Sequence, residues 1–478
     1  MRNTSSRGSV MSFRAAAIAL AALLSLSAWP ALARDVATAP TLPGSAIPGL
    51  SAEHLDAAFW IDRIGRRDRV LLQPDQVAQQ NVRMLDDDPA IHDIEALPGT
   101  LERTQVEAWI RALSVPPTRT LYNETGKAGS QRQLDRLVTN LALAQIPQTQ
   151  FTRHGMVVRR ADVRTFPTRL RVFHTPGETD LDRFQETALF PGTPVVIAHA
   201  SRDRAWLFVV SATYAGWVEA RHVAQGDRRA IFEYARRAPY LVVTGASAST
   251  AFTPSRREVS TVQLEMGVRV PVLADWPLDA PVNGQHPLAS HIIELPTRAA
   301  DGSLVFAPAL LPRSADVAAG YLPMTSTAII AQAFKFLGER YGWGHDYNAR
   351  DCSGFVGEVY RGFGVLMPRN TGAQATSRAL SGVTLTATDD HARRVALLRD
   401  TRVGDLVHIP GHVMLVIGHL DGAPYVIHDV AGMSHRVADG GIVRTPLNGV
   451  VVTPLLPMLG GDGRDIADHV TAIRQMAP

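Results

Sequence analysis

The spacing of apolar and polar positions changes along the chain. Between residues 51 and 145, apolar side chains recur with helical spacing. We expect three short helices here: one that follows Ser51, one at Leu101–Leu113 and one at Gln131–Leu143. From about residue 150, short apolar runs alternate with turn residues, which is typical of strands in small barrels. We therefore expect a first small β-barrel at 150–233 and a second at 234–318.

The last third of the chain has helical spacing first and strand-like alternation afterwards. Two helices are expected at Thr325–Leu337 and Cys352–Phe363. Three strands are expected after them, near Leu406–His408, His412–Ile417 and Tyr425–His428. Helices that precede an antiparallel sheet indicate an α+β domain, which we place at 319–460, with a C-terminal tail at 461–478.

The first 33 residues have the pattern of a secretory signal peptide. Positive residues precede an apolar run, and a small-x-small cleavage site follows it (Arg2, Arg7 and Arg14; 15–28; Ala31-Leu32-Ala33). We expect a signal peptide at 1–33, a linker and helical clip at 34–149, and a protein exported to the periplasm or secreted. No Cys follows the apolar run, so a lipid anchor has no attachment point.

Charge and cysteine content narrow the function classes. The formal net charge of +3 equals the charge of the three arginines in the expected signal peptide, so the mature chain is near neutral and no nucleic-acid partner is expected. No later segment is long and apolar enough for stable membrane insertion. The single cysteine, Cys352, cannot form an internal disulfide, which leaves an inert buried thiol or a thiol kept for chemistry. Nothing suggests more than a monomer.

Cys352 stands where a helix is expected to begin. Asp351 is a suitable N-cap residue, and the apolar spacing starts just after it. A helix N-terminus carries unpaired N–H groups and a partial positive charge, which favour a thiolate over a thiol. The sequence therefore favours Cys352 as a nucleophile.

Two histidines on neighbouring strands are candidates for the base and its orienting partner. His412 begins one expected strand and His428 ends the next. If the turn between them were only Asp421-Gly422, the two side chains would point to opposite faces of the hairpin. A three-residue loop, Leu420-Asp421-Gly422, would place them on the same face, and the catalytic hypothesis requires this loop.

A metal site is the competing hypothesis for these histidines. His408 and His412 have the i, i+4 spacing of a helical zinc pair, but Pro410-Gly411 and the Val/Ile-rich flanks argue against a helix there. A zinc site built from Cys352 and histidines remains a minor alternative. We expect no metal and no cofactor.

Several segments together resemble the NlpC family of cell-wall peptidases, which have a papain-like α+β fold. The matching segments are Tyr341-Gly342-Trp343-Gly344, Asp351-Cys352-Ser353-Gly354-Phe355-Val356, Gly404-Asp405-Leu406-Val407 and Gly411–Gly418, with Arg369, Thr371 and Gln374. The resemblance covers about residues 321–455. One departure is His345, where many members have a second Gly after the Trp-Gly.

The resemblance implies roles for single residues. Cys352, His412 and His428 would be the catalytic triad. Asp351 and Ser353 would help to bind a free amino end of the substrate, and Tyr341 would lie near the oxyanion.

The two expected barrels resemble bacterial SH3-like domains. This likeness rests on Arg164-Thr165-Phe166-Pro167 and Tyr214-Ala215-Gly216-Trp217-Val218. A helical clip, two SH3-like domains and a peptidase resemble family members that cut γ-D-glutamyl–diamino acid bonds in muropeptides. Tyr214 and Trp217 would then contact short stem peptides with a free L-Ala, unless they belong to the barrel core. The alternatives are a papain-like amidase or acyltransferase and a non-catalytic peptidoglycan-binding protein.

Overall fold

The structure is a computed structural model that describes residues 47–67, 69–277, 279–437 and 440–477, which belong to one compact unit. The expected signal peptide at 1–33 lies outside these residues. In the part of the chain that the structure describes, no helix has the length and apolar character needed to cross a bilayer.

The N-terminal region is divided between two hydrophobic cores. Its elements are α1 (Ala57–Ile61), β1 (Val70–Leu72), α2 (Pro74–Asp87), β2 (Thr100–Glu102), α3 (Arg103–Leu113), α4 (Gln131–Asn140) and β3 (Thr149–Phe151). Trp60 of α1 and Met84 of α2 lie in the same core as the Cys352 helix. Val106 and Ile110 of α3 lie in the core of the barrel that follows. Helix α2 was not predicted; Pro74 at its first turn starts it, and Val77 and Met84 bury one face.

The first barrel region is one antiparallel sheet of seven strands, in the order β10-β4-β7-β8-β9-β5-β6. The strands are β4 (Arg153–Val157), β5 (Ala161–Arg164), β6 (Gln185–Leu189), β7 (Pro194–Ala200), β8 (Trp206–Val210), β9 (Ala215–Glu219) and β10 (Val223–Gly226), with α5 (Arg228–Arg236) after them. Buried aromatic side chains fill this core, among them Phe166, Phe208 and Trp217.

The next region contains three small sheets around a separate core. The strands are β11 (Tyr240–Val243), β12 (Ser247–Ser249), β13 (Gln263–Glu265), β14 (Arg269–Pro271), β15 (Ser290–Arg298), β16 (Leu304–Pro312) and β17 (Val317–Ala318). They pair as β14-β11-β17, β12-β13 and β15-β16 instead of as one continuous sheet. Asp301-Gly302 lies in the turn that connects β15 to β16. A second SH3-like barrel here stays a prediction.

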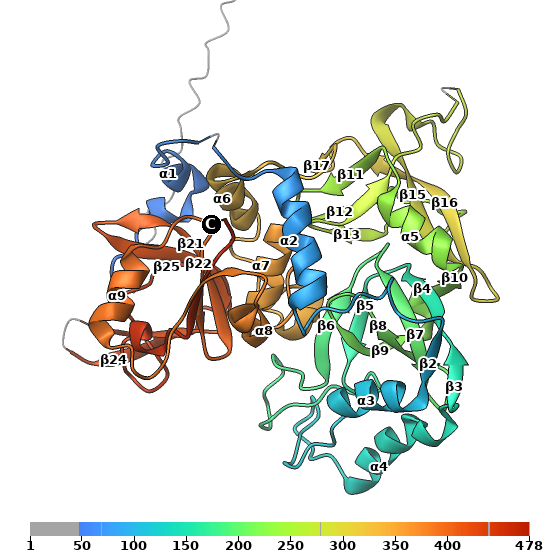
Figure 1. Cartoon of the computed structure of the whole chain (residues 1–478), viewed down its shortest axis with the longest axis horizontal. Coiled ribbons are helices and arrows are strands. Elements are labelled where there is room, and N and C mark those ends of the chain that lie inside the picture. The colour runs from blue at the N-terminus through green and yellow to red at the C-terminus, as the bar shows by residue number, and fades with distance from the viewer. Residues whose placement is uncertain (1–46, 68, 278, 438–439, 478) are drawn as a thin grey trace, which may run out of the picture. The chain divides into compact units, whose positions relative to one another are not determined.

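The C-terminal domain packs helices against a six-stranded antiparallel sheet of order β19-β27-β20-β21-β22-β25 (Figure 1). Its elements are β18 (Met324–Thr325), α6 (Ser326–Phe334), α7 (Cys352–Arg361), α8 (Thr371–Thr376), β19 (Ser381–Thr384), α9 (His391–Arg399), β20 (Leu406–Ile409), β21 (His412–Leu420), β22 (Ala423–Val430), β23 (Met433–Arg436), β24 (Ile442–Thr445), β25 (Gly449–Pro454), β26 (Met458–Leu459) and β27 (Ala472–Gln475). The helices come first and the sheet follows, as the α+β prediction requires.

Two strands outside the predicted range 319–460 pair with strands of this domain. Strand β1 of the N-terminal region pairs with β18. Strand β27 lies between β19 and β20, so residues 461–477 are not a tail outside the domain. The predicted tail was wrong because Ala472–Gln475 is a short strand whose pairing partners lie far away in sequence, and local spacing does not reveal them.

Candidate active site

Helix α7 begins at Cys352, as predicted. The Asp351 side chain caps it by accepting a hydrogen bond from the Gly354 N–H at 2.8 Å. Phe355, Val356 and Val359 are fully buried between α7 and the sheet, and each stabilises this packing by about 1.5–3 kcal/mol. The sequence thus fixes the start of α7 by a cap and its orientation by an apolar face.

His412 and His428 reach the same face by a route other than the predicted one. The turn contains only two residues, because Leu420 pairs with Ala423 across Asp421-Gly422. A β-bulge between Val416 and Gly418 then shifts the register by one residue. The three-residue loop is therefore wrong, but the bulge supplies the same shift.

The two imidazoles form a hydrogen-bonded chain with Thr453. His412 Nε2 lies 2.8 Å from His428 Nδ1, and His428 Nε2 lies 3.1 Å from Thr453 Oγ1. The simplest tautomer has protons on both Nε2 atoms, so each ring donates to the next acceptor. His412 Nδ1 is then left as the free base of the pair.

The sulfur of Cys352 lies between α8 and the beginning of β21. Its Sγ is 3.5 Å from Thr371 Oγ1, and the sulfur also accepts a hydrogen bond from the Val413 backbone. Val413 follows His412 directly, so the contact places the sulfur beside the strand that carries the candidate base. The Cys352 side chain is nevertheless buried, with 5% of its surface exposed.

Burial decides the resting protonation state. It raises the pKa of Cys352 to about 11, and the nearby Asp351 carboxylate acts in the same direction. Burial also lowers the pKa of His412 to about 4. Both shifts favour a thiol and a neutral imidazole in the free protein at neutral pH, because desolvation opposes the effect of the helix N-terminus.

Asp351 and Ser353, expected at the substrate amine, are bound inside the protein. Arg369 donates from Nη1 and Nη2 to both carboxylate oxygens of Asp351, at 3.1 and 2.7 Å, and from Nη1 to Ser353 Oγ at 2.9 Å. Gly344 N–H also donates to Asp351 Oδ2, at 3.0 Å. With five donors on its carboxylate, Asp351 has no free lone pair for a substrate ammonium.

Tyr214 is bonded to the carboxylate of Glu186, a residue that was not predicted to belong to the site. Its hydroxyl donates to Glu186 Oε2, and Thr165 Oγ1 donates to Glu186 Oε1 at 2.6 Å. Glu186 is partly exposed, and no cation pairs with it among the described residues. Arg369 influences the pKa of Tyr214, which places this barrel carboxylate near the Asp351 cluster. No local motif marks Glu186 in the sequence, because only the fold brings it to the site.

Trp217 is a core residue and not a substrate contact. Its side chain is fully buried, packs edge-on against Phe208 and donates from Nε1 to Ser114 Oγ at 3.1 Å. Trp217 lies in the core that α3 shares with the barrel strands, whereas the next residue, Val218, lies in a core made of barrel strands alone. The prediction of a binding role for Trp217 is therefore wrong.

Tyr341 and Asp429 lie on the side of the sheet that faces α7. Tyr341 is buried, and its pKa is raised by burial and then by Cys352, Asp351 and Asp429. Asp429 follows His428 on β22, is fully buried, and has no hydrogen-bond partner on either oxygen. Burial raises the pKa of Asp429 to about 9, helped by Asp351 and Glu339, so this carboxyl is neutral at pH 7.

Other potential sites lie apart from Cys352. A cavity of about 490 Å³ lies on the barrel side of α7, lined by Gly354, Gly357 and Glu358, and Cys352 is not among its lining residues. Within the described ranges, the side chains grouped closely enough to hold a metal ion are His391, Asp465 and Asp468. Cys352, His412 and His428 are not part of that group.

A cysteine at a helix start beside a histidine pair on an antiparallel sheet is the arrangement of a cysteine hydrolase. Comparison with known proteins defines the family. Residues 338–450 match the NlpC/P60 family, and residues 171–219 match an SH3 domain of the SH3b1 type. The chain therefore carries a C-terminal domain of the NlpC/P60 family of cysteine peptidases, preceded by an SH3 domain.

One solved structure shows the same fold at low sequence identity, and a second is less similar. A novel NlpC/P60 endopeptidase from Photobacterium damselae subsp. piscicida is 17% identical with a TM-score of 0.69, over 88% of this chain and 96% of that one. An NlpC/P60 family protein from Bacillus cereus ATCC 10987 is 19% identical with a TM-score of 0.40, over 62% of this chain and 83% of that one. No curated protein sequence matches the chain.

Proposed function

We propose that the protein is a cysteine endopeptidase that hydrolyses the γ-D-glutamyl–L-diamino acid bond of murein stem peptides with a free N-terminal L-Ala. The observation that carries this proposal is the chain His412–His428–Thr453 beside the helix that starts at Cys352. It leaves His412 with an unprotonated Nδ1 at the start of the strand whose next residue, Val413, contacts the Cys352 sulfur, and a neutral thiol–imidazole pair needs such a base for acyl transfer.

The proposed reaction begins with a proton transfer coupled to attack. The thiol proton passes to His412 Nδ1 as Sγ bonds to the γ-carbonyl carbon of D-Glu. His412 then returns the proton to the departing amine of the diamino acid, the C–N bond breaks, and a thioester remains on Cys352. A water molecule, deprotonated by His412, attacks the thioester; the C–S bond breaks and Cys352 regains its proton. His428 holds the ring of His412 in the required tautomer throughout.

Selection of short stems is assigned to the Glu186–Tyr214 pair. Glu186 has acceptor capacity left on both oxygens and no cationic partner in the described part of the chain, so it suits a substrate ammonium. Asp351 and Ser353 act indirectly in this account, because Arg369 occupies both. Tyr341 lies near the nucleophile, where it would contact the oxyanion.

We also propose the cellular setting. The pattern at 1–33 supports export to the periplasm or the medium, where muropeptides are accessible. The mature chain would act as a monomer, without nucleic acid and without stable membrane insertion.

The test is digestion of defined muropeptides with the chain from residue 34 onward. We expect L-Ala-γ-D-Glu as a product, loss of cleavage in Cys352→Ala, and no cleavage when the L-Ala amine carries a muramoyl group. Glu186→Gln should raise KM for the free-amine substrate, whereas Glu178→Gln, in the loop before the same strand, should not. Release of the whole stem peptide from a muramoyl-linked substrate, by cleavage at the L-Ala amide, would instead indicate an amidase, and wall binding without any cleavage would indicate a non-catalytic protein.

A further inference from the structure

Arg369 uses all of its donors inside the protein, and one of them ends on an unexpected partner. The five N–H groups point to Thr187 Oγ1, both oxygens of Asp351, Ser353 Oγ and His345 Nδ1. The distance from Arg369 Nη2 to His345 Nδ1 is 3.0 Å. His345 therefore completes the set of acceptors that holds the guanidinium against the cap of α7.

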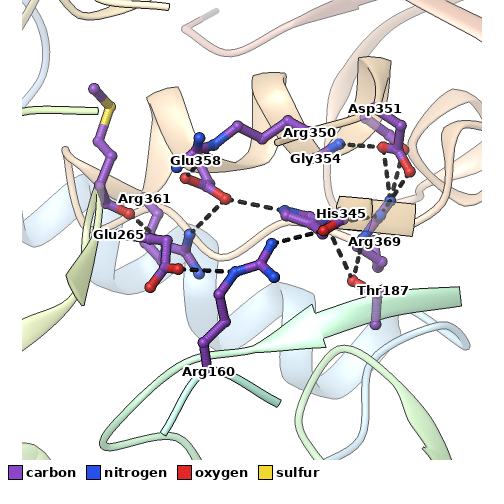
Figure 2. A network of polar contacts seen from close by, with 12 residues as sticks. Arg160, Thr187, Glu265, His345, Arg350, Asp351, Gly354, Glu358, Arg361 and Arg369 are labelled. Carbon is purple, nitrogen blue, oxygen red and sulfur yellow. Dashed lines mark hydrogen bonds and ion pairs between the residues drawn. The ribbon is translucent and has the colours of Figure 1, made fainter. Parts of the chain in front are cut away.

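The other nitrogen of His345 is bound to a second carboxylate on α7. His345 Nε2 lies 2.9 Å from Glu358 Oε1, and Arg350 donates to Glu358 Oε2 at 3.0 Å (Figure 2). The Glu358 carboxylate fixes the proton on Nε2, so Nδ1 is free to accept from Arg369. Burial, and next the Arg369 cation, lowers the pKa of His345 to about 4, which keeps the ring neutral.

These contacts run along one side of the nucleophile helix. Asp351 and Glu358 are seven positions apart, so they lie on the same side of α7, two turns from each other. Glu358 contacts His345, His345 contacts Arg369, and Arg369 contacts Asp351, so these contacts connect the two ends of this two-turn stretch of α7. We call these four residues the α7 relay.

The backbone at His345 indicates that its ring is kept for these contacts. His345 has φ +65°, a left-handed conformation that favours Gly and is unfavourable for other residues. The helix also leaves room for the ring, because a Cβ at Gly354 would come within 2.6 Å of His345 Cε1. Two positions thus accommodate one buried imidazole.

The first barrel contacts the α7 relay at both of its middle members. Thr187 on β6 accepts from Arg369 Nε at 2.6 Å. Arg160, between β4 and β5, donates to the backbone oxygen of His345 at 2.7 Å and forms an ion pair with Glu265 at 2.9 Å (Figure 2). The first barrel is therefore bonded to the Arg369 side chain and to the backbone of His345.

We propose that His345 is a positioning residue that joins Glu358 to Arg369 and so holds Asp351 and the first turn of α7, with Cys352, in place against the SH3 domain. This inference rests on the proposed function for its role in turnover. Its geometric content, the placement of the Cys352 thiol, can be measured without a substrate.

The experiment compares His345→Leu, His345→Gln and His345→Gly in the chain from residue 34 onward. Leu keeps a side chain of similar size without polar atoms. Gln keeps one acceptor and one donor about as far apart as the two ring nitrogens. Gly removes the ring and the left-handed strain together. Asn348→Gly is the matched control, because Asn348 has φ +61° in the same loop but bonds to Gln263 instead of to the relay.

The readouts are kcat and KM on a free-amine muropeptide, the iodoacetamide alkylation rate of Cys352, and Tm. We expect kcat to fall at least tenfold in the Leu and Gly variants with a smaller change in KM, and to stay within threefold of wild type in the Gln variant. The alkylation rate should change in the same two variants and not in Asn348→Gly. If the Leu variant does not fold, the Gly variant, which relieves strain, supplies the comparison.

Two results would overturn the inference. One is wild-type kcat and alkylation in both the Leu and Gly variants. The other is a Gln variant that loses as much as Leu, which would assign the effect to ring shape instead of to the hydrogen bonds. A wild-type chain that cleaves no muropeptide would refute the proposed function alone, because the alkylation rates would still report on the relay.

Discussion

Gly418 lies against the indole of Trp60, so closely that a Cβ at residue 418 would be 2.8 Å from Trp60 Cε3. Gly418 is also the residue at which the β-bulge of β21 ends. A residue of the N-terminal region therefore packs on the irregularity that brings His412 and His428 to one face.

Replacing Gly418 by Ala should disturb both stability and activity. The added methyl must displace Trp60 or the bulge, which we expect to cost about 1–3 kcal/mol of unfolding free energy and to lower kcat more than it raises KM. Gly357→Ala is the control, because a Cβ there meets no atom within 4 Å and helix α7 should gain up to about 1 kcal/mol. Thermal unfolding and muropeptide kinetics measure the two effects. An active, fully stable Gly418→Ala protein would contradict the role of this contact.

The resting state of the thiol has a clear pH signature. Because burial raises the pKa of Cys352 to about 11 and lowers that of His412 to about 4, the iodoacetamide rate should rise steadily from pH 6 to pH 10 without a plateau. The acid limb of kcat/KM should lie near pH 4, where His412 becomes protonated. An alkylation plateau with an apparent pKa below about 7 would instead show a resting thiolate–imidazolium pair.

Asp429 should make the fold less stable as the pH rises. Its folded pKa of about 9 exceeds the unfolded value of about 3.9. Below pH 4 the carboxyl is therefore protonated in both states, and it does not lower the free energy of unfolding. Between these values the unfolded chain releases a proton that the folded chain retains, and the loss grows up to pH 9. Asp429→Asn should therefore raise the unfolding free energy by roughly 2–4 kcal/mol at pH 7 and by almost nothing at pH 4. Denaturant titrations at both pH values test this, and an equal effect at both would contradict the raised pKa.

Substitution of Trp217 should affect stability, whereas substitution of Tyr214 should affect substrate binding. Trp217→Phe should lower the unfolding free energy by about 2–3 kcal/mol through lost packing and the lost bond to Ser114, and should leave KM unchanged. Tyr214→Phe removes only the hydroxyl bonded to Glu186, so it should raise KM for free-amine substrates with little effect on Tm. A raised KM in Trp217→Phe at a temperature where it is fully folded would restore its predicted binding role.

The parts of the site that could be predicted depend on residues that are close together in the sequence. A cap residue, an apolar face and a family segment all fall within a few positions of Cys352, so the sequence alone placed the nucleophile at a helix start. The lone histidines also fell on the expected strands. Their shared face was predicted for the wrong reason. Turn chemistry suggested a register shift in the loop at 420–422, and the fold makes the shift between Val416 and Gly418, against Trp60.

The parts that were not predictable depend on residues far apart in sequence. Strand β27 pairs with β19 and β20, and Glu186 reaches the site only through the barrel. The burial that opposes a thiolate was not predictable for a related reason: a helix N-terminus is visible in the sequence, whereas burial is a property of the packed protein.

The central claim is that Cys352 forms a thioester with the glutamyl carbonyl. Rapid acid quenching during turnover of L-Ala-γ-D-Glu-diaminopimelate, followed by intact-protein and peptide mass spectrometry, tests it most directly. The account predicts a transient gain equal to L-Ala-γ-D-Glu minus water on the peptide that contains Cys352, and no gain in His412→Ala. Continued hydrolysis without that adduct, or an adduct on any other residue, would contradict it.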